Sequence, residues 1–270
     1  MLLATIAKLL LYGGVTLVAG DVSLRRFRVL DATGSAADVR PSVRRALRAL
    51  WAALALLLLA QVRDLELGAD YREYAALLTD TGWGHAWLLL VAAVLVTHLA
   101  VTKRWRTSVQ VASVALLAFA MGGLGHAAAD SSPYIGRLLD MLHVLGVGAW
   151  LGGLYFVARR AVHEHQGEAW RTFSKVATIA APLVVLTGFA ASVRRVGGVG
   201  AGEAYRSDYG RLLLIKLALA LVVLAFGAIH RQRTVKRRPS GAVYVHAELA
   251  FAALVFLVTS VLTGTAPPGE

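Results

Sequence analysis

The stretch Leu212–His230 reads LLLIKLALALVVLAFGAIH, and Lys216 is the one residue in it that carries a charge at neutral pH. A helix needs about 20 predominantly apolar residues to cross the hydrocarbon core of a bilayer. Within that core the backbone must pair its own N–H and C=O groups, which a helix does inside one segment. The stretch therefore predicts a transmembrane helix.

Seven further apolar stretches of similar length occur along the chain, each bounded by charged clusters or by turns with Gly or Pro. Together they predict an all-α integral membrane protein, a polytopic bundle of about eight transmembrane helices. We expect one membrane domain over residues 1–270, with no room for a sizeable soluble domain. The predicted helices lie near 2–20, 46–62, 83–101, 109–126, 138–158, 173–193, 212–230 and 244–264.

The composition agrees with this class and excludes several chemistries. Of the 270 residues, 57% are hydrophobic and 16% are charged, whereas roughly a quarter of a soluble domain is charged. Cysteine is absent, which excludes disulfides, Cys-based zinc sites and a thiolate relay for copper. No His-Glu-x-x-His run, phosphate loop or nucleophile–base motif is present. We therefore expect a function other than enzyme catalysis.

The formal net charge of +12 comes mainly from the connections after the first, third, fifth and seventh stretches. Basic loops remain on the cytoplasmic side of a membrane. This pattern predicts that both termini lie outside the cytoplasm and that the basic loops lie within it. The partner of these charges is then the lipid bilayer, and no nucleic acid is expected.

A polar group is predicted near the outer surface, where the fourth stretch ends in His126 and the fifth begins with Asp140 and His143. At about 100° per residue, Asp140 and His143 lie about 60° apart around a helix, and His143 and Trp150 about 20° apart. Two imidazoles and a carboxylate suit a divalent transition metal, especially Cu(II). Asp140 could instead orient the His143 ring, and either histidine could simply bond to loop carbonyls.

Gly148 and Gly152 follow in the same stretch. Two small residues four apart allow another helix to approach closely. We therefore expect a tight helix contact at this point.

Other polar residues in the apolar stretches are functional candidates because they are costly in lipid. Lys216 could reach outward or pair with Asp140, and His85 could join an outer site or belong to an interfacial aromatic belt. The thioether of Met121 would favour Cu(I), although it lies about 140° from His126 around the helix. Glu248 and His98 could form an inner exit with His230 and His246, which could equally be interfacial residues.

At these residues the sequence resembles the CopD family of bacterial inner-membrane copper-resistance and copper-uptake proteins. Four stretches carry the resemblance, most clearly from the fourth helix onward: Gly125-His126-Ala127, Asp140-Met141-Leu142-His143 through Leu154, Tyr209-Gly210-Arg211-Leu212-Leu213 with Lys216, and Glu248-Leu249.

The resemblance implies a protein that takes copper at the periplasmic face and moves it toward the cytoplasm. It also implies a periplasmic CopC-type carrier as the copper donor, and it places His126 and His143 at the family's histidine positions. Two alternatives stay open. Histidines from neighbouring helices can also ligate haem b, which would make the protein a membrane cytochrome that passes electrons, possibly to Cu(II). His126 with His143 would hold an outer haem, and His98 with His230 or His246 an inner one. The other alternative is a structural or assembly subunit with no ligand of its own.

Overall fold

The structure is a computed structural model, and it describes residues 2–27, 29, 40–68, 70–124, 133–160, 166–196, 206–235 and 242–266. Within these residues the chain is almost entirely helical and contains no strand. Eight helical segments in the described part are long and apolar enough to cross a membrane. The predicted all-α polytopic fold is thus confirmed.

Six of the eight spanning segments are longer than the predicted apolar stretches because helical hydrogen bonding continues into the charged residues that flank them, and the fourth and eighth have the predicted length. They are α1 (Leu2–Arg26), α2 (Arg40–Asp64), α4 (Gly82–Thr102), α5 (Thr107–Met121) with the 3-10 turn η2 (Gly122–Leu124), α6 (Pro133–Val147) continued by the π-helical turn η4 (Gly148–Gly152) and α7 (Gly153–Arg160), α8 (Gln166–Val196), α10 (Asp208–Val235) and α11 (Ala242–Leu262).

A short ninth segment, α3 (Tyr71–Thr79), was not predicted, because the acidic connection that contains it has no long apolar run. Its first turn is capped by Asp70, whose carboxylate accepts the Arg72 backbone N–H at 2.9 Å. Leu77 is its one buried residue. Helix α3 packs against the start of α4, where a side chain at Gly84 would collide with the Leu77 carbonyl oxygen.

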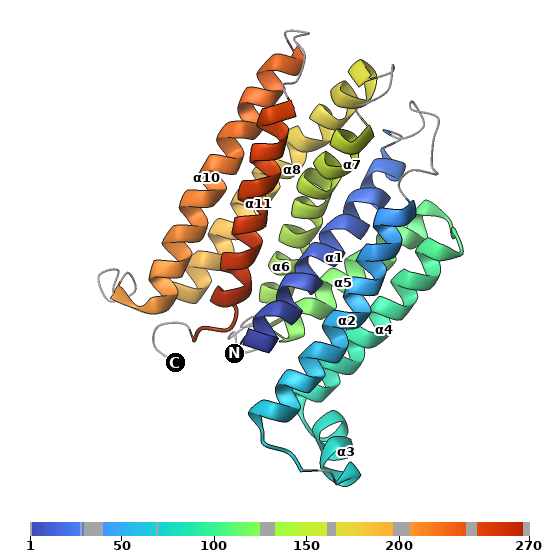
Figure 1. Cartoon of the computed structure of the whole chain (residues 1–270), viewed down its shortest axis with the longest axis vertical. Helices are drawn as coiled ribbons and strands as arrows, with labels where there is room; N and C mark the ends of the chain where they lie inside the picture. Colours follow the sequence, from blue (N-terminus) through green and yellow to red (C-terminus); the bar gives the residue numbers. More distant parts are fainter. Residues whose placement is uncertain are drawn as a thin grey trace.

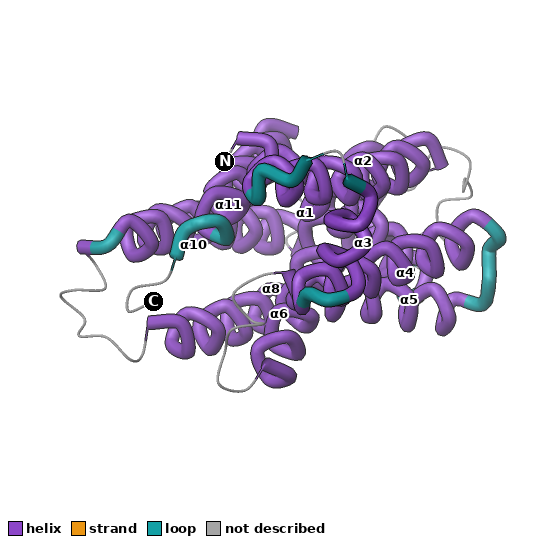
Figure 2. Tube along the Cα trace, turned by 90° about the horizontal axis from the view of Figure 1, so that it is seen from below, coloured by secondary structure: helices purple, strands orange, loops and turns teal. Residues whose placement is uncertain are grey.

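The helices form two groups on either side of α1 and the α6–η4–α7 segment (Figure 1). Helices α2, α4 and α5 lie on one side, and α8, α10 and α11 lie on the other, an arrangement that the perpendicular view also shows (Figure 2). The start of α1 meets the end of α11, since the Lys8 amine donates to the Thr263 carbonyl oxygen at 2.7 Å and the Tyr12 hydroxyl to Thr263 Oγ1 at 3.2 Å. We call this the terminal end of the bundle. That it faces the periplasm stays a prediction.

Helix α1 packs directly on the π-helical turn η4. A side chain at Gly152 would meet the Thr16 carbonyl oxygen and lie 3.0 Å from the Gly20 Cα, and one at Gly148 would meet Ala19. The expected close helix contact at this glycine pair is confirmed. With α1 covering the glycine face of the α6–η4 segment, the polar face is left to α8, α10 and α11.

Candidate functional site

His143 projects from α6 onto α8, where two oxygen atoms hold its ring. The Nδ1 atom lies 3.1 Å from the Val184 carbonyl oxygen and 3.1 Å from Thr187 Oγ1. The Thr187 hydroxyl donates its own hydrogen to the Leu183 carbonyl oxygen at 2.6 Å. A hydroxyl has one hydrogen and a carbonyl has none, so both oxygens accept from the ring. The Nδ1 atom therefore carries the proton.

This hydrogen bonding leaves the lone pair on Nε2 of His143. Metal-binding histidines are commonly held in this way, with the second ring nitrogen donating to a carbonyl, a carboxylate or water. Gly188 of α8 makes room for the ring, because a Cβ there would lie 3.1 Å from His143 Cε1. The residues around His143 thus fit the role of a single imidazole ligand for a metal ion.

Asp140 lies one turn before His143 and is bound to Arg195 of α8. One guanidinium nitrogen of Arg195 donates to both carboxylate oxygens of Asp140 at 3.1 Å. The two side chains are 24% and 26% exposed. Tyr209 forms a further hydrogen bond with Arg195. Val184 and Thr187, rather than Asp140, therefore orient the His143 ring.

Lys216 completes this group from α10. It lies within electrostatic range of Asp140, Arg195 and His143, while the direct salt bridge of Asp140 is with Arg195. We call these five residues the α6–α8 cluster: Asp140, His143, Arg195, Tyr209 and Lys216. The cluster holds two cationic side chains against one carboxylate, so a copper ion at His143 would experience net repulsion from its neighbours.

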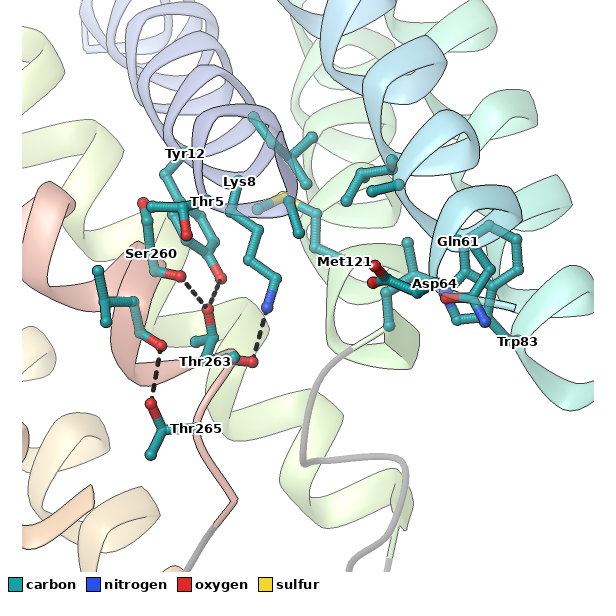
Figure 3. A pocket seen from close by; sticks show the side chains of 17 residues that line it. Thr5, Lys8, Tyr12, Gln61, Asp64, Trp83, Met121, Ser260, Thr263 and Thr265 are labelled. Atoms are coloured by element: carbon teal, nitrogen blue, oxygen red, sulfur yellow. Dashed lines mark hydrogen bonds between the residues drawn. The ribbon is translucent and has the colours of Figure 1, made fainter. Parts of the chain in front are cut away.

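A cavity of about 380 Å³ opens at the terminal end of the bundle (Figure 3). Lys8 and Tyr12 of α1 extend toward Thr263 on one side of it, and Asp64 and Trp83 lie on the other. Met121 also lines the cavity. Its thioether, which was predicted as a candidate ligand, therefore belongs to the cavity and not to the α6–α8 cluster. Tyr12 lies within electrostatic range of Asp140 and Arg195. The cavity wall therefore includes one residue within electrostatic range of the cluster.

Further toward the opposite end, Trp150 of the π-helical turn meets Glu248 of α11. The two side chains share a hydrogen bond, and both are buried, Glu248 to 1% exposure. Asp140, His143 and Trp150 each contact a residue of α8 or α11. The predicted polar face of this segment is thus present.

His98 lies elsewhere in the bundle. Its Nδ1 accepts a hydrogen bond from the Trp51 indole N–H at 3.1 Å, which binds α4 to α2. Helix α4 and helices α10 and α11 are on opposite sides of the bundle in both views (Figures 1 and 2). The structure therefore does not join His98 to Glu248, or to His230 as a haem-binding pair.

The two remaining predicted residues give less information. His126 falls outside the described residues, and His85 is exposed at the start of α4. Among the residues that the structure describes, no three His, Asp or Glu side chains come together as a metal-binding group.

Several residues around the cluster were not found from the sequence, namely Val184, Thr187, Arg195, Tyr12 and Lys8 as a cavity residue. Arg195 directly follows an apolar stretch, where a basic residue is typical of a helix end, and its guanidinium binds Asp140. A signal for Lys8 existed, since a lysine inside an apolar helix is costly unless it faces a polar space.

Comparison with known proteins supports the resemblance seen in the sequence. Residues 167–262 match the family described as "Copper resistance protein D". The resemblance to the CopD family is confirmed. The CopD match covers α8, α10 and α11, including Arg195, Lys216 and Glu248, and it does not extend to His143.

A curated relative, the copper transport protein CutJ of Bacillus subtilis (strain 168), is 28% identical over 154 residues, which is 54% of this chain. The chain spans only 28% of that relative's length. No solved structure matches the chain. The eight candidate spans are those of a multi-pass membrane protein, and the CopD match relates its last three helices to a copper-resistance family.

Proposed function

We propose that the protein transports copper across the bacterial inner membrane, from the terminal end toward the opposite end, without catalysing a covalent reaction. One observation carries this proposal: the His143 ring is held with its proton on Nδ1 and its lone pair on Nε2. That arrangement is common among metal-binding histidines, and the CopD match supports copper as the metal.

The position of His143 suits a site reached from the terminal end. It lies ten residues after Pro133, the first residue of α6, which corresponds to about 15 Å of helix. Tyr12 of the cavity wall lies within electrostatic range of Asp140 and Arg195. Copper would enter the cavity, pass the Asp140–Arg195 pair and bind His143.

The local charge favours release as well as binding. A site on a transport path must bind strongly enough to accept its ion and weakly enough to lose it. Arg195 and Lys216 lie within electrostatic range of His143 and would lower its affinity for a cation. Asp140 could serve as a copper ligand only after it separates from Arg195.

The direction of transport rests on the distribution of Lys and Arg, which predicts that the terminal end faces the periplasm. The membrane potential would then favour cation uptake by about 2.3 kcal/mol per charge per 100 mV. A periplasmic CopC-type carrier would deliver copper to the terminal end.

Copper content and an absorption spectrum of detergent-purified protein test this proposal. We would compare wild type, His143→Ala and the double variant His126→Ala/His143→Ala, with His85→Ala as the control because His85 is exposed and outside the cluster. Copper bound by wild type and His85→Ala, and lost stepwise in the other two, is expected. Equal copper in all four would overturn the proposal. A Soret band that disappears in the double variant would assign these histidines to haem.

A further inference from the structure

Glu248 is a carboxylate in the middle of a membrane-spanning bundle, and its side chain is 1% exposed. Such a group is costly in lipid and marks ion or proton pathways in membrane proteins. Within the described part of the chain, no lysine, arginine or histidine forms a salt bridge with it. Its assigned partner is Trp150, which donates one hydrogen bond. A carboxylate has about four acceptor positions, so one indole N–H leaves most of them for another ligand.

Three segments build the surroundings of Glu248. The π-helical turn η4 carries Trp150, and such turns often occur at functional sites because they displace the helix by one residue. Gly227 of α10 packs closely on this pair, since a Cβ there would lie only 3.3 Å from both Glu248 Oε1 and Trp150 Cζ2. A larger residue at 227 would crowd the carboxylate.

Glu248 contacts Trp150, which belongs to the same helical segment as His143. Trp150 follows His143 by seven residues in one continuous segment, which amounts to about 10 Å along the axis. Beyond it, His230 follows Gly227 by one turn of α10 and is buried against Trp170, with ring centroids 4.4 Å apart. The succession from the terminal end is therefore His143, then Glu248, then His230.

We propose that Glu248 is a second binding station for the transported copper ion, between His143 and the opposite end of the bundle. The inference rests on the proposed transport function. The arriving cation supplies the counter-charge that the buried carboxylate lacks, and Trp150 is a positioning residue that holds one carboxylate oxygen. The ion changes ligands from the His143 imidazole to the Glu248 carboxylate, and its oxidation state stays the same.

Glu248→Gln separates this role from a structural one. Glutamine keeps the shape and the carbonyl oxygen that accepts from Trp150, and it removes only the charge. In proteoliposomes loaded with a copper chelator, we expect Glu248→Gln to reduce uptake of buffered Cu⁺ or Cu²⁺ at least tenfold. The loss of copper uptake should exceed the loss of copper binding in detergent, because His143 remains able to bind an ion.

Trp150→Phe provides a second test, with Trp51→Phe as the matched control because Trp51 also donates one indole hydrogen bond, in the α2–α4 contact. We expect lower uptake in Trp150→Phe and wild-type uptake in Trp51→Phe. Wild-type uptake by Glu248→Gln would overturn the second station even if His143→Ala abolishes binding. Wild-type binding and uptake by His143→Ala would instead overturn the transport site itself, whatever Glu248→Gln does.

Discussion

Replacement of Thr187 by valine tests whether the hydrogen bonds to the His143 ring set its affinity for copper. Valine has the shape of threonine without the hydroxyl. In Thr187→Val the Nδ1–H group keeps the Val184 carbonyl oxygen at 3.1 Å and loses Thr187 Oγ1 at 3.1 Å. Loss of a group that orients a metal ligand costs about 10–100-fold in affinity. Since one of the two acceptors remains, we expect a loss of copper affinity at the low end of this range, about tenfold in the dissociation constant or about 1.4 kcal/mol in binding free energy.

Thr178→Val is the control for this change. Thr178 lies on the same helix, and its hydroxyl donates to the Ser174 carbonyl oxygen at 2.7 Å, as Thr187 does to Leu183 at 2.6 Å. Both variants lose that bond, and only Thr187→Val alters the surroundings of His143. Competition with a chromophoric copper chelator would give the two dissociation constants. If they were equal while His143→Ala lost binding, the orienting role of Thr187 would be wrong.

Three further predictions follow from individual contacts. Gly152→Ala should destabilise the detergent-solubilised protein by about 1–3 kcal/mol because its Cβ overlaps α1, whereas Gly13→Ala meets nothing within 4 Å and should be neutral in the same thermal unfolding assay. Arg195→Met should cost more than the roughly 1 kcal/mol of an exposed ion pair and less than the about 3–5 kcal/mol of a buried one, measured by denaturant unfolding beside Arg211→Met, which breaks the exposed pair with Asp208. His98→Ala should lower stability and leave copper uptake in proteoliposomes unchanged, because His98 binds α4 to α2; reduced uptake would place His98 on the path.

The fold could be predicted because lipid imposes one simple requirement on every spanning segment. Each must be apolar and about 20 residues long, so hydropathy alone locates the helices. The close approach of α1 to Gly148 and Gly152 was also predictable, since small residues four apart leave one consistent strip of a helix without side chains. The missed α3 has neither signal, because nine residues with a single buried leucine produce no long apolar run.

The partners within the candidate site could not be predicted, because they depend on how neighbouring helices are rotated. Helical periodicity placed Asp140 and His143 on one face, but it cannot state that Arg195, fifty-five residues later, reaches Asp140. For the same reason Asp140 was considered as the group that orients His143, a role that Val184 and Thr187 have. The expected exit of Glu248 with His98 assumed that equal depth meant proximity, and the two lie in different helix groups.

Four of the polar contacts described above share one location, the boundary between α8, α10 and α11 and the rest of the bundle. Tyr12 meets Thr263 across it, and so do Asp140 and Arg195, His143 and Val184, and Trp150 and Glu248. The apolar packing of this group is sparse, since 6% of the apolar window of α10 and 17% of that of α8 are buried, against 39% for α1 and 50% for the segment that contains α6.

Much of the contact across this boundary is therefore polar, whereas apolar packing joins the other helices. A ligand shifts a conformational equilibrium only by the difference in its affinity for the two states. A copper ion at His143 or Glu248 would bind at that boundary and replace contacts that join the two parts. Its binding free energy would then favour one position of α8, α10 and α11 relative to α1 and α6 over another. Release toward the opposite end requires this change of position.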